Sequence, residues 1–173
     1  MNRNIFEILK EEHSELKNLL GKVEDLENYE RADALESIKS NLIPHARGEE
    51  KTLYAMTRKT SKRHGDEDSL NLANEAYEEH RAVDKLINDL EDLSVNDEKW
   101  LPRFMVIKEN IEHHIKEEEN ELFKKCREFF SPNELSDMGG AYLTEKEKFS
   151  ETLPTQAQIK SRDLGDSMTN ISQ

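Results

Sequence analysis

A ten-residue pattern occurs twice in this 173-residue chain and indicates how the chain is built. Residues 45–54 and 114–123 both read His-x-x-x-Glu-Glu-x-x-Leu-aromatic. A shorter pattern, Glu-Glu-His, occurs at residues 11–13 and again at 78–80. The offset between copies is 69 residues for the first pattern and 67 for the second. The chain therefore repeats a unit of two segments, and an approximate twofold symmetry is expected to relate the two copies.

Apolar residues recur every three to four positions in four segments, which is the period of an amphipathic α-helix. These segments span residues 5–26, 32–58, 69–93 and 98–129. Strand-favouring runs of Val, Ile and Thr are absent, and only six Gly and four Pro interrupt the chain. A helix pair that occurs twice closes naturally into an up-down-up-down arrangement. The prediction is an all-α protein whose residues 1–130 form a four-helix bundle.

Capping residues and prolines predict where these helices begin and bend. Ser69 and Asp97 carry side chains that cap helix N-termini, so the third and fourth helices should begin after them. Pro44 falls inside the second helix and predicts a kink or a break there, whereas Pro102 lies in a first turn that tolerates it. Residues 60–68 are basic, then acidic with a glycine, and are predicted to form a surface connection.

The sequence changes character after the fourth helix. Ser131 and Pro132 are typical of a helix start and predict a short additional C-terminal helix over residues 131–149. Residues 150–173 are rich in Ser, Thr and Gln, and we expect a polar tail that is mobile or docks elsewhere.

Charge and hydropathy exclude several classes of partner. The net charge is −13, and no basic stripe that could bind nucleic acid or an anionic membrane is visible. No apolar run approaches the roughly 20 residues of a membrane span, and the N-terminus does not resemble a secretory signal. Cys126 is the single cysteine, so no intramolecular disulfide can form. We therefore expect a cytoplasmic protein.

Each predicted helix carries one histidine on its apolar stripe, and two helices carry a glutamate one turn later. At a spacing of i,i+4 the His and Glu side chains share one face. The candidate metal ligands are His13, His45, Glu49, His80, His114 and Glu118. Unpaired buried carboxylates would be costly or would stay protonated, whereas a metal cation satisfies them directly. A lone helical histidine is usually a core residue, but four in register with a duplicated motif favour a metal site.

Other polar residues near the motifs are predicted to have different roles. His64 lies in the predicted connection and should be a surface residue. His113 and Glu117 each precede a candidate ligand by one position, which rotates them about 100° from the core face. Cys126 and Trp100 are expected to pack in the core.

Four further glutamates adjoin the candidate ligands, and most are expected to lie on solvated faces. They are Glu12, Glu50, Glu79 and Glu119. A hydrogen bond from one of them to a ligating imidazole is the alternative.

The donor set favours iron, with manganese as the alternative, because imidazole and carboxylate ligands are mixed. Tetrahedral zinc would need fewer ligands, and a structural zinc site would need paired cysteines. If both glutamates and an oxo or hydroxo group bridge two metals, each metal keeps one open position. Such a centre could bind a small diatomic molecule or peroxide.

The His13, His45/Glu49, His80 and His114/Glu118 pattern resembles the hemerythrin-like proteins of the bacterial cation-binding branch, over about residues 5–130. The resemblance implies a non-haem di-iron centre with bridging carboxylates that handles dioxygen, peroxide or nitric oxide. The short helix after Pro132 also resembles the segment C-terminal to the bundle in such proteins.

One position departs from the oxygen-carrying members, which have a second histidine one turn before the third-helix ligand. Here that residue is Ala76, and Tyr77 is the nearest candidate substitute. Reversible oxygen carriage is therefore less favoured than sensing, iron handling or repair of damaged iron centres. An oxidase- or peroxidase-like enzyme and a purely structural bundle are the alternatives.

Overall fold

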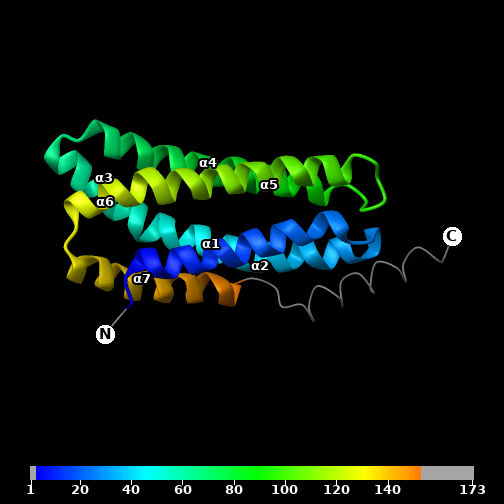
Figure 1. The fold of residues 1–173 in the computed structure, drawn as a ribbon, viewed down its shortest axis with the longest axis horizontal. Helices are drawn as coiled ribbons and strands as arrows, with labels where there is room; N and C mark the ends of the chain where they lie inside the picture. Colours follow the sequence, from blue (N-terminus) through cyan, green and yellow to red (C-terminus); the bar gives the residue numbers. More distant parts are fainter. Residues whose placement is uncertain (1–2, 153–173) are drawn as a thin grey trace.

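The computed structural model describes residues 3–152, and this part of the chain is all-α, as predicted (Figure 1). The elements are α1 Ile5–Lys22, η1 Val23–Asp25, α2 Asn28–Lys51, α3 Leu53–His64, α4 Glu67–Glu91, α5 Trp100–Glu117, η2 Glu118–Leu122, α6 Phe123–Phe129 and α7 Pro132–Thr152. Figure 1 shows α4 and α5 running along one side of the bundle, with α1 and α2 along the other. The four-helix bundle with an additional C-terminal helix is confirmed.

The sequence predicts a kink or a break at Pro44, and the second bundle helix does not break there. Helix α2 continues through Pro44 to Lys51, and the interruption lies at Thr52, between α2 and α3. Proline removes one backbone donor, and a long helix can tolerate that loss when packing holds it. Thr52 leaves the helical region, with φ −118° and ψ −82°, while its hydroxyl donates to the carbonyl of Gly48 at 2.7 Å.

The fourth bundle helix is interrupted at the corresponding place. The regular α5 gives way to the π-helical segment η2 at Glu118, and α6 resumes at Phe123. A π-helical turn is uncommon and is found frequently at functional sites. In both copies of the repeat, regular α-helix is therefore lost near the motif glutamate, three residues after Glu49 in one copy and at Glu118 itself in the other.

The prediction of a surface connection over residues 60–68 is wrong for most of that range. Helix α3 extends to His64, and Thr60 and Ser61 are buried. Gly65 ends the helix in the left-handed conformation at φ 71°, which favours glycine. Only Gly65 and Asp66 separate α3 from α4.

Both predicted helix caps are displaced by a few residues. Asp66, and not Ser69, caps α4, and its carboxylate accepts the Ser69 backbone N–H at 2.9 Å. Helix α5 begins at Trp100 with Lys99 at the cap position. The Asp97 carboxylate instead accepts the Lys99 N–H at 2.8 Å, in the turn that precedes the helix.

Two apolar clusters fill the bundle core on either side of its middle. One contains Phe6, Leu9, Leu122 and Phe123, together with parts of α7. The other contains residues such as Leu16, Val83 and Trp100. Trp100 is buried and stacks on Phe104, and Cys126 is buried beside Thr57, so both pack as predicted.

Helix α7 packs mainly against α2 and also against α1 (Figure 1). Its Gly139 lies directly against the backbone carbonyl of Arg3, where any Cβ would collide. Its Tyr142 ring covers Gly48, and a Cβ on Gly48 would come within 2.6 Å of that ring. The helix extends to Thr152, beyond the predicted end at residue 149, and residues 153–173 of the predicted tail lie outside the described residues.

Candidate metal centre

The bundle brings all of the predicted ligands together in its interior, between the two apolar clusters. They are His13 on α1, His45 and Glu49 on α2, His80 on α4, His114 on α5 and Glu118 on η2. Each is at most 6% exposed. Two overlapping groups, His13 with His45 and Glu49, and Glu49 with His80 and His114, each present ligand atoms within 4.8 Å of one another. Glu49 is common to both groups, so it is placed to bridge two cations.

The Nε2 atoms of the histidines face one another and the carboxylates. His13 Nε2 lies 3.2 Å from Glu118 Oε2, and His45 Nε2 lies 3.3 Å from Glu49 Oε1. On the other side, the Nε2 atoms of His80 and His114 are 3.0 Å apart. One pair of imidazoles therefore comes from each half of the repeat, which matches two adjacent cation positions.

A ring of four glutamates surrounds the histidines and holds their Nδ1 atoms. The Nδ1–carboxylate distances are 3.0 Å for His45–Glu12, 3.1 Å for His80–Glu50, 2.7 Å for His114–Glu79 and 2.8 Å for His13–Glu119. Each bond joins one bundle helix to the next, and together they close around the bundle. The expectation that most of these glutamates lie on solvated faces is therefore wrong, and the alternative of a bond to an imidazole holds for all four.

These outer bonds determine which ring nitrogen is free. A carboxylate accepts, so the Nδ1 of each histidine donates its proton outward. In a neutral ring the Nε2 lone pair then points into the centre, which is the form that binds a metal. The carboxylates also fix the rotation of each ring. This geometry makes the donor set suitable for a cation before any cation arrives.

Several buried polar atoms in the centre have no hydrogen-bond partner among the described residues. They are His13 Nε2, Glu49 Oε1, Glu118 Oε1 and Glu118 Oε2. Buried polar atoms are rarely left unpaired, because each costs free energy when it is removed from water. A cation among them would satisfy all of these atoms. The residues present thus fit a metal with mixed nitrogen and oxygen ligands.

The acidity of the central groups reflects the same crowding of charge. Burial and the charge of Glu118 raise the pKa of Glu49 well above its usual range. Burial would also raise the pKa of Glu118, but the adjacent His13 ring, whose Nε2 lies 3.2 Å from Glu118 Oε2, holds it at about 2. Burial disfavours charge on His13, yet the three carboxylates that face its ring raise its pKa well above the usual range. Glu49 and His13 therefore hold protons more strongly than usual, and a bound cation could supply the same positive charge.

The two remaining histidines of the bundle are placed at the surface, as predicted. His64 is exposed at the end of α3, and its ring stacks on Phe129. His113 is exposed on α5, with its Nε2 3.2 Å from the Glu117 carboxylate.

Sequence reasoning missed Tyr54, which reaches the centre from the first turn of α3. Its hydroxyl lies 3.4 Å from the Nε2 atoms of both His80 and His114 and 3.5 Å from Glu49 Oε2. The repeat held a signal for this position, because it aligns Tyr54 with Phe123 and only one copy carries a hydroxyl. Tyr77, the substitute considered for Ala76, is only partly buried and packs against the cluster around Phe6.

Tyr142 on α7 was missed as well. Its hydroxyl donates to Glu12 Oε2 at 2.5 Å and lies 2.9 Å from His45 Nδ1. Lys146 lies on the next turn of α7 and places its ammonium 2.8 Å from the same Glu12 oxygen. The additional helix thus completes the surroundings of one histidine. The sequence could not indicate this, because the contact depends on where α7 docks.

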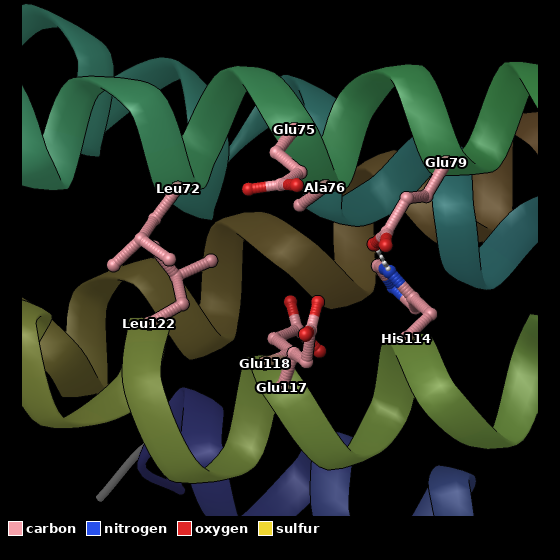
Figure 2. Close-up of a pocket in the computed structure, with 8 residues that line it drawn as sticks. All are labelled: Leu72, Glu75, Ala76, Glu79, His114, Glu117, Glu118 and Leu122. Carbon is pink, nitrogen blue, oxygen red and sulfur yellow. Dashed lines mark hydrogen bonds and ion pairs between the residues drawn. The ribbon is translucent and has the colours of Figure 1, made fainter.

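A small pocket with a cavity volume of about 20 Å³ lies between α4 and the α5–η2 segment (Figure 2). Its lining consists of Leu72, Glu75, Ala76, Glu79, His114, Glu117, Glu118 and Leu122. Figure 2 shows the carboxylates of Glu117 and Glu118 directed toward α4, where Ala76 has only a methyl group to present. The pocket thus reaches a buried carboxylate of the centre past the small side chain of Ala76.

Comparison with known families gives one match. The family model of the hemerythrin HHE cation binding domain matches residues 4–126, which contain every residue of the centre on the four bundle helices. No curated protein and no solved structure matches the chain. The match ends before α7, so Tyr142 and Lys146 lie outside the matched region. Within residues 3–152, no helix is long and apolar enough to cross a membrane.

Proposed function

Because this chain belongs to the hemerythrin HHE cation binding domain family, we propose that its centre holds two iron ions and binds a small ligand such as dioxygen, peroxide or nitric oxide. The observation that carries the proposal is the set of unpaired atoms on His13, Glu49 and Glu118, which are buried and face two pairs of imidazoles. Iron at such a centre supplies a Lewis acid and a redox couple. Manganese is the alternative metal.

Six residues would bind the metal directly, and four outer glutamates would hold the histidine rings in place. His13 and His45 would hold one ion, His80 and His114 would hold the other, and Glu49 would lie between them. Glu118 faces His13 and supplies the second carboxylate. The outer glutamates keep the four rings oriented, which preorganises the site and raises the basicity of each ligand.

The surroundings support binding of a small, uncharged ligand more than turnover of a large substrate. The two apolar clusters of the core, one containing Phe123 and the other containing Leu16, enclose the centre on both sides. The pocket beside Ala76 reaches two proposed ligands of the centre, His114 and Glu118, and it is small. The phenol of Tyr54 can donate a hydrogen bond to a ligand held near His80 and His114.

The test is anaerobic reconstitution of the purified protein with ferrous iron, followed by metal analysis and optical spectroscopy. We expect two iron ions per chain, and shifts in the spectrum on addition of azide or nitric oxide. Rapid turnover of peroxide would indicate an enzyme instead, and loss of iron to a mild chelator would indicate iron handling. A protein that binds no metal would overturn the proposal.

A further inference from the structure

The twofold repeat allows the two sides of the centre to be compared residue by residue. The offsets of 67 and 69 residues pair Ala76 with Leu9, Glu75 with Ile8, and Glu117 with Gly48. The apolar Leu9 and Ile8 and the small Gly48 lie on the α1–α2 side, whereas Ala76 and the two glutamates lie on the α4–α5 side. The repeat is therefore symmetric in its ligands and asymmetric in what lies outside them.

Helix α7 covers the α1–α2 side. Gly139 places α7 against the end of the Ile8 side chain, and the Tyr142 ring fills the space above Gly48. The outer carboxylate on this side, Glu12, is neutralised by Lys146 and hydrogen-bonded to Tyr142. Helix α7 thus occupies the space over this half of the centre.

On the α4–α5 side, the space that corresponds to the one covered by α7 is the pocket beside Ala76 (Figure 2). Glu75, Glu79 and Glu117 line it, and Glu118 lies at its inner end. Glu79 corresponds to Glu12 in the repeat but has no lysine of α7 beside it within residues 3–152. Two buried oxygens of Glu118 lack a hydrogen-bond partner in the same part of the chain. An open acidic pocket thus leads to a buried carboxylate that needs a positive charge.

A cation could also be held at the mouth of this pocket. Ligand atoms of Glu79, His113 and Glu117 lie within 4.8 Å of one another, and His113 is exposed. Carboxylate and imidazole ligands at a cleft focus the electrostatic potential and raise the local concentration of cations. A surface cluster of this kind does not by itself indicate a metal site. The unpaired oxygens of Glu118 below it, however, could bind a cation that the cluster has captured.

We propose that this pocket is the entrance through which divalent cations reach the buried centre, with capture by Glu79, His113 and Glu117 and transfer to Glu118. The inference rests on the proposed function, because it assumes that the centre binds metal. It further assigns α7 the role of closing the equivalent route on the opposite side. Metal would therefore enter one half of the bundle first.

The rate of metal uptake tests the route separately from the capacity of the centre. Metal-free protein is mixed with cobalt(II) under anaerobic conditions in a stopped-flow instrument, and the visible bands of the bound ion are followed. The double variant Glu75→Gln/Glu117→Gln removes two charges at the entrance without altering the six proposed ligands. The matched control, Glu15→Gln/Glu98→Gln, removes the same charge from exposed positions elsewhere.

We expect uptake to slow about tenfold in the entrance variant, to depend less on ionic strength, and to reach the same final spectrum. The control should load at the rate of the unmodified protein. Ala76→Leu, which copies Leu9 of the other half, should also slow loading by filling the pocket.

Equal rates in the unmodified protein and the entrance variant would overturn the assigned route. Equal slowing in both double variants would also overturn it, because the effect would then come from net charge alone. If the unmodified protein takes up no cobalt(II), iron or manganese, the proposed function itself fails, and the entrance fails with it.

Discussion

The carboxylate of Glu119 accepts a hydrogen bond from Nδ1 of His13 at 2.8 Å, across 106 residues of sequence. This bond joins η2, late in the bundle, to α1 at its beginning, and so closes the ring of Glu–His pairs around the centre. Because the same η2 segment carries Glu118, the π-helical turn places one carboxylate inside the ring and the next one on it. The orientation of His13 therefore depends on the irregular part of the fourth bundle helix.

Replacement of Glu119 should weaken metal binding although Glu119 is not a proposed ligand. Glu119→Ala frees the His13 ring to rotate and removes the acceptor that keeps its Nδ1 protonated. Loss of such an outer partner typically costs about 10- to 100-fold in metal affinity. The measurement is competitive titration with a chelator of known affinity. Glu15→Ala, on the exposed face of the same α1 helix as His13, is the control and should leave the affinity unchanged.

The proposed ligands themselves should be separable from the surface histidines. His45→Ala and His114→Ala each remove one nitrogen ligand beside a motif glutamate and should lose most of the bound metal. His64→Ala should keep the full metal content, because His64 is exposed at the end of α3. Metal analysis after gel filtration gives the comparison. Similar losses in all three variants would contradict the ligand assignment.

Metal binding should release protons at neutral pH. The pKa of His13 and that of Glu49 are both raised well above their usual ranges, so both groups hold protons more strongly than usual in the metal-free protein. A metal at Nε2 of His13 and between the carboxylates must displace these protons. Affinity should consequently increase with pH. Calorimetric titration in buffers of different ionisation enthalpy measures the number released, and no proton release at pH 7 would contradict this account.

The docking of α7 can be tested with two glycine substitutions of opposite effect. Gly48→Ala should lower the melting temperature, because its new Cβ would approach the Tyr142 ring at 2.6 Å and force α7 outward. Gly21→Ala has no neighbour within 4 Å and should stabilise α1 by about 0.5–1 kcal/mol, the usual gain from alanine in a helix. Thermal unfolding followed by circular dichroism compares them. A stabilising effect at both positions would mean that α7 does not dock on Gly48.

The bundle and its inner ligands could be predicted because helical periodicity alone aligns them. His13 shares a stripe with Leu9 and Leu16, and His45 lies one turn before Glu49, so one helix at a time is enough. The family match supports the same helices over residues 4–126. The division of residues 1–130, 131–149 and 150–173 into separate parts stays a prediction.

The outer contacts could not be predicted in this way, since each depends on two helices. Glu12 lies one position before His13 and reaches His45, which is on the neighbouring helix. A rotation of about 100° moves a side chain off its own stripe but toward the flank of the next helix. The sequence indicates that rotation but not which neighbour receives the side chain. Tyr142 is a further case, because its position depends on the packing of α7 against Gly48.

The last prediction concerns Tyr54, because its hydroxyl lies 3.4 Å from the Nε2 atoms of both His80 and His114. The sequence suggests Tyr77 as a substitute for the ligand missing at Ala76, but in the structure it is Tyr54 whose hydroxyl lies beside His80 and His114. Burial, together with the charges of Glu118 and Glu49, raises the pKa of the Tyr54 phenol well above its usual range. The phenol should therefore stay protonated in the metal-free protein and lose its proton only to a bound cation.

A ferric ion bound to this phenolate would give a charge-transfer band in the visible region. We expect Tyr54→Phe to abolish that band in the oxidised, iron-loaded protein and to leave the iron content close to that of the unmodified protein. Tyr77→Phe is the matched control and should retain the band, because Tyr77 packs in the apolar cluster around Phe6. Absorption and resonance Raman spectra of the three proteins provide the readout. If the spectra of the unmodified protein and of Tyr54→Phe coincide, Tyr54 remains a protonated hydrogen-bond donor and does not bind the iron.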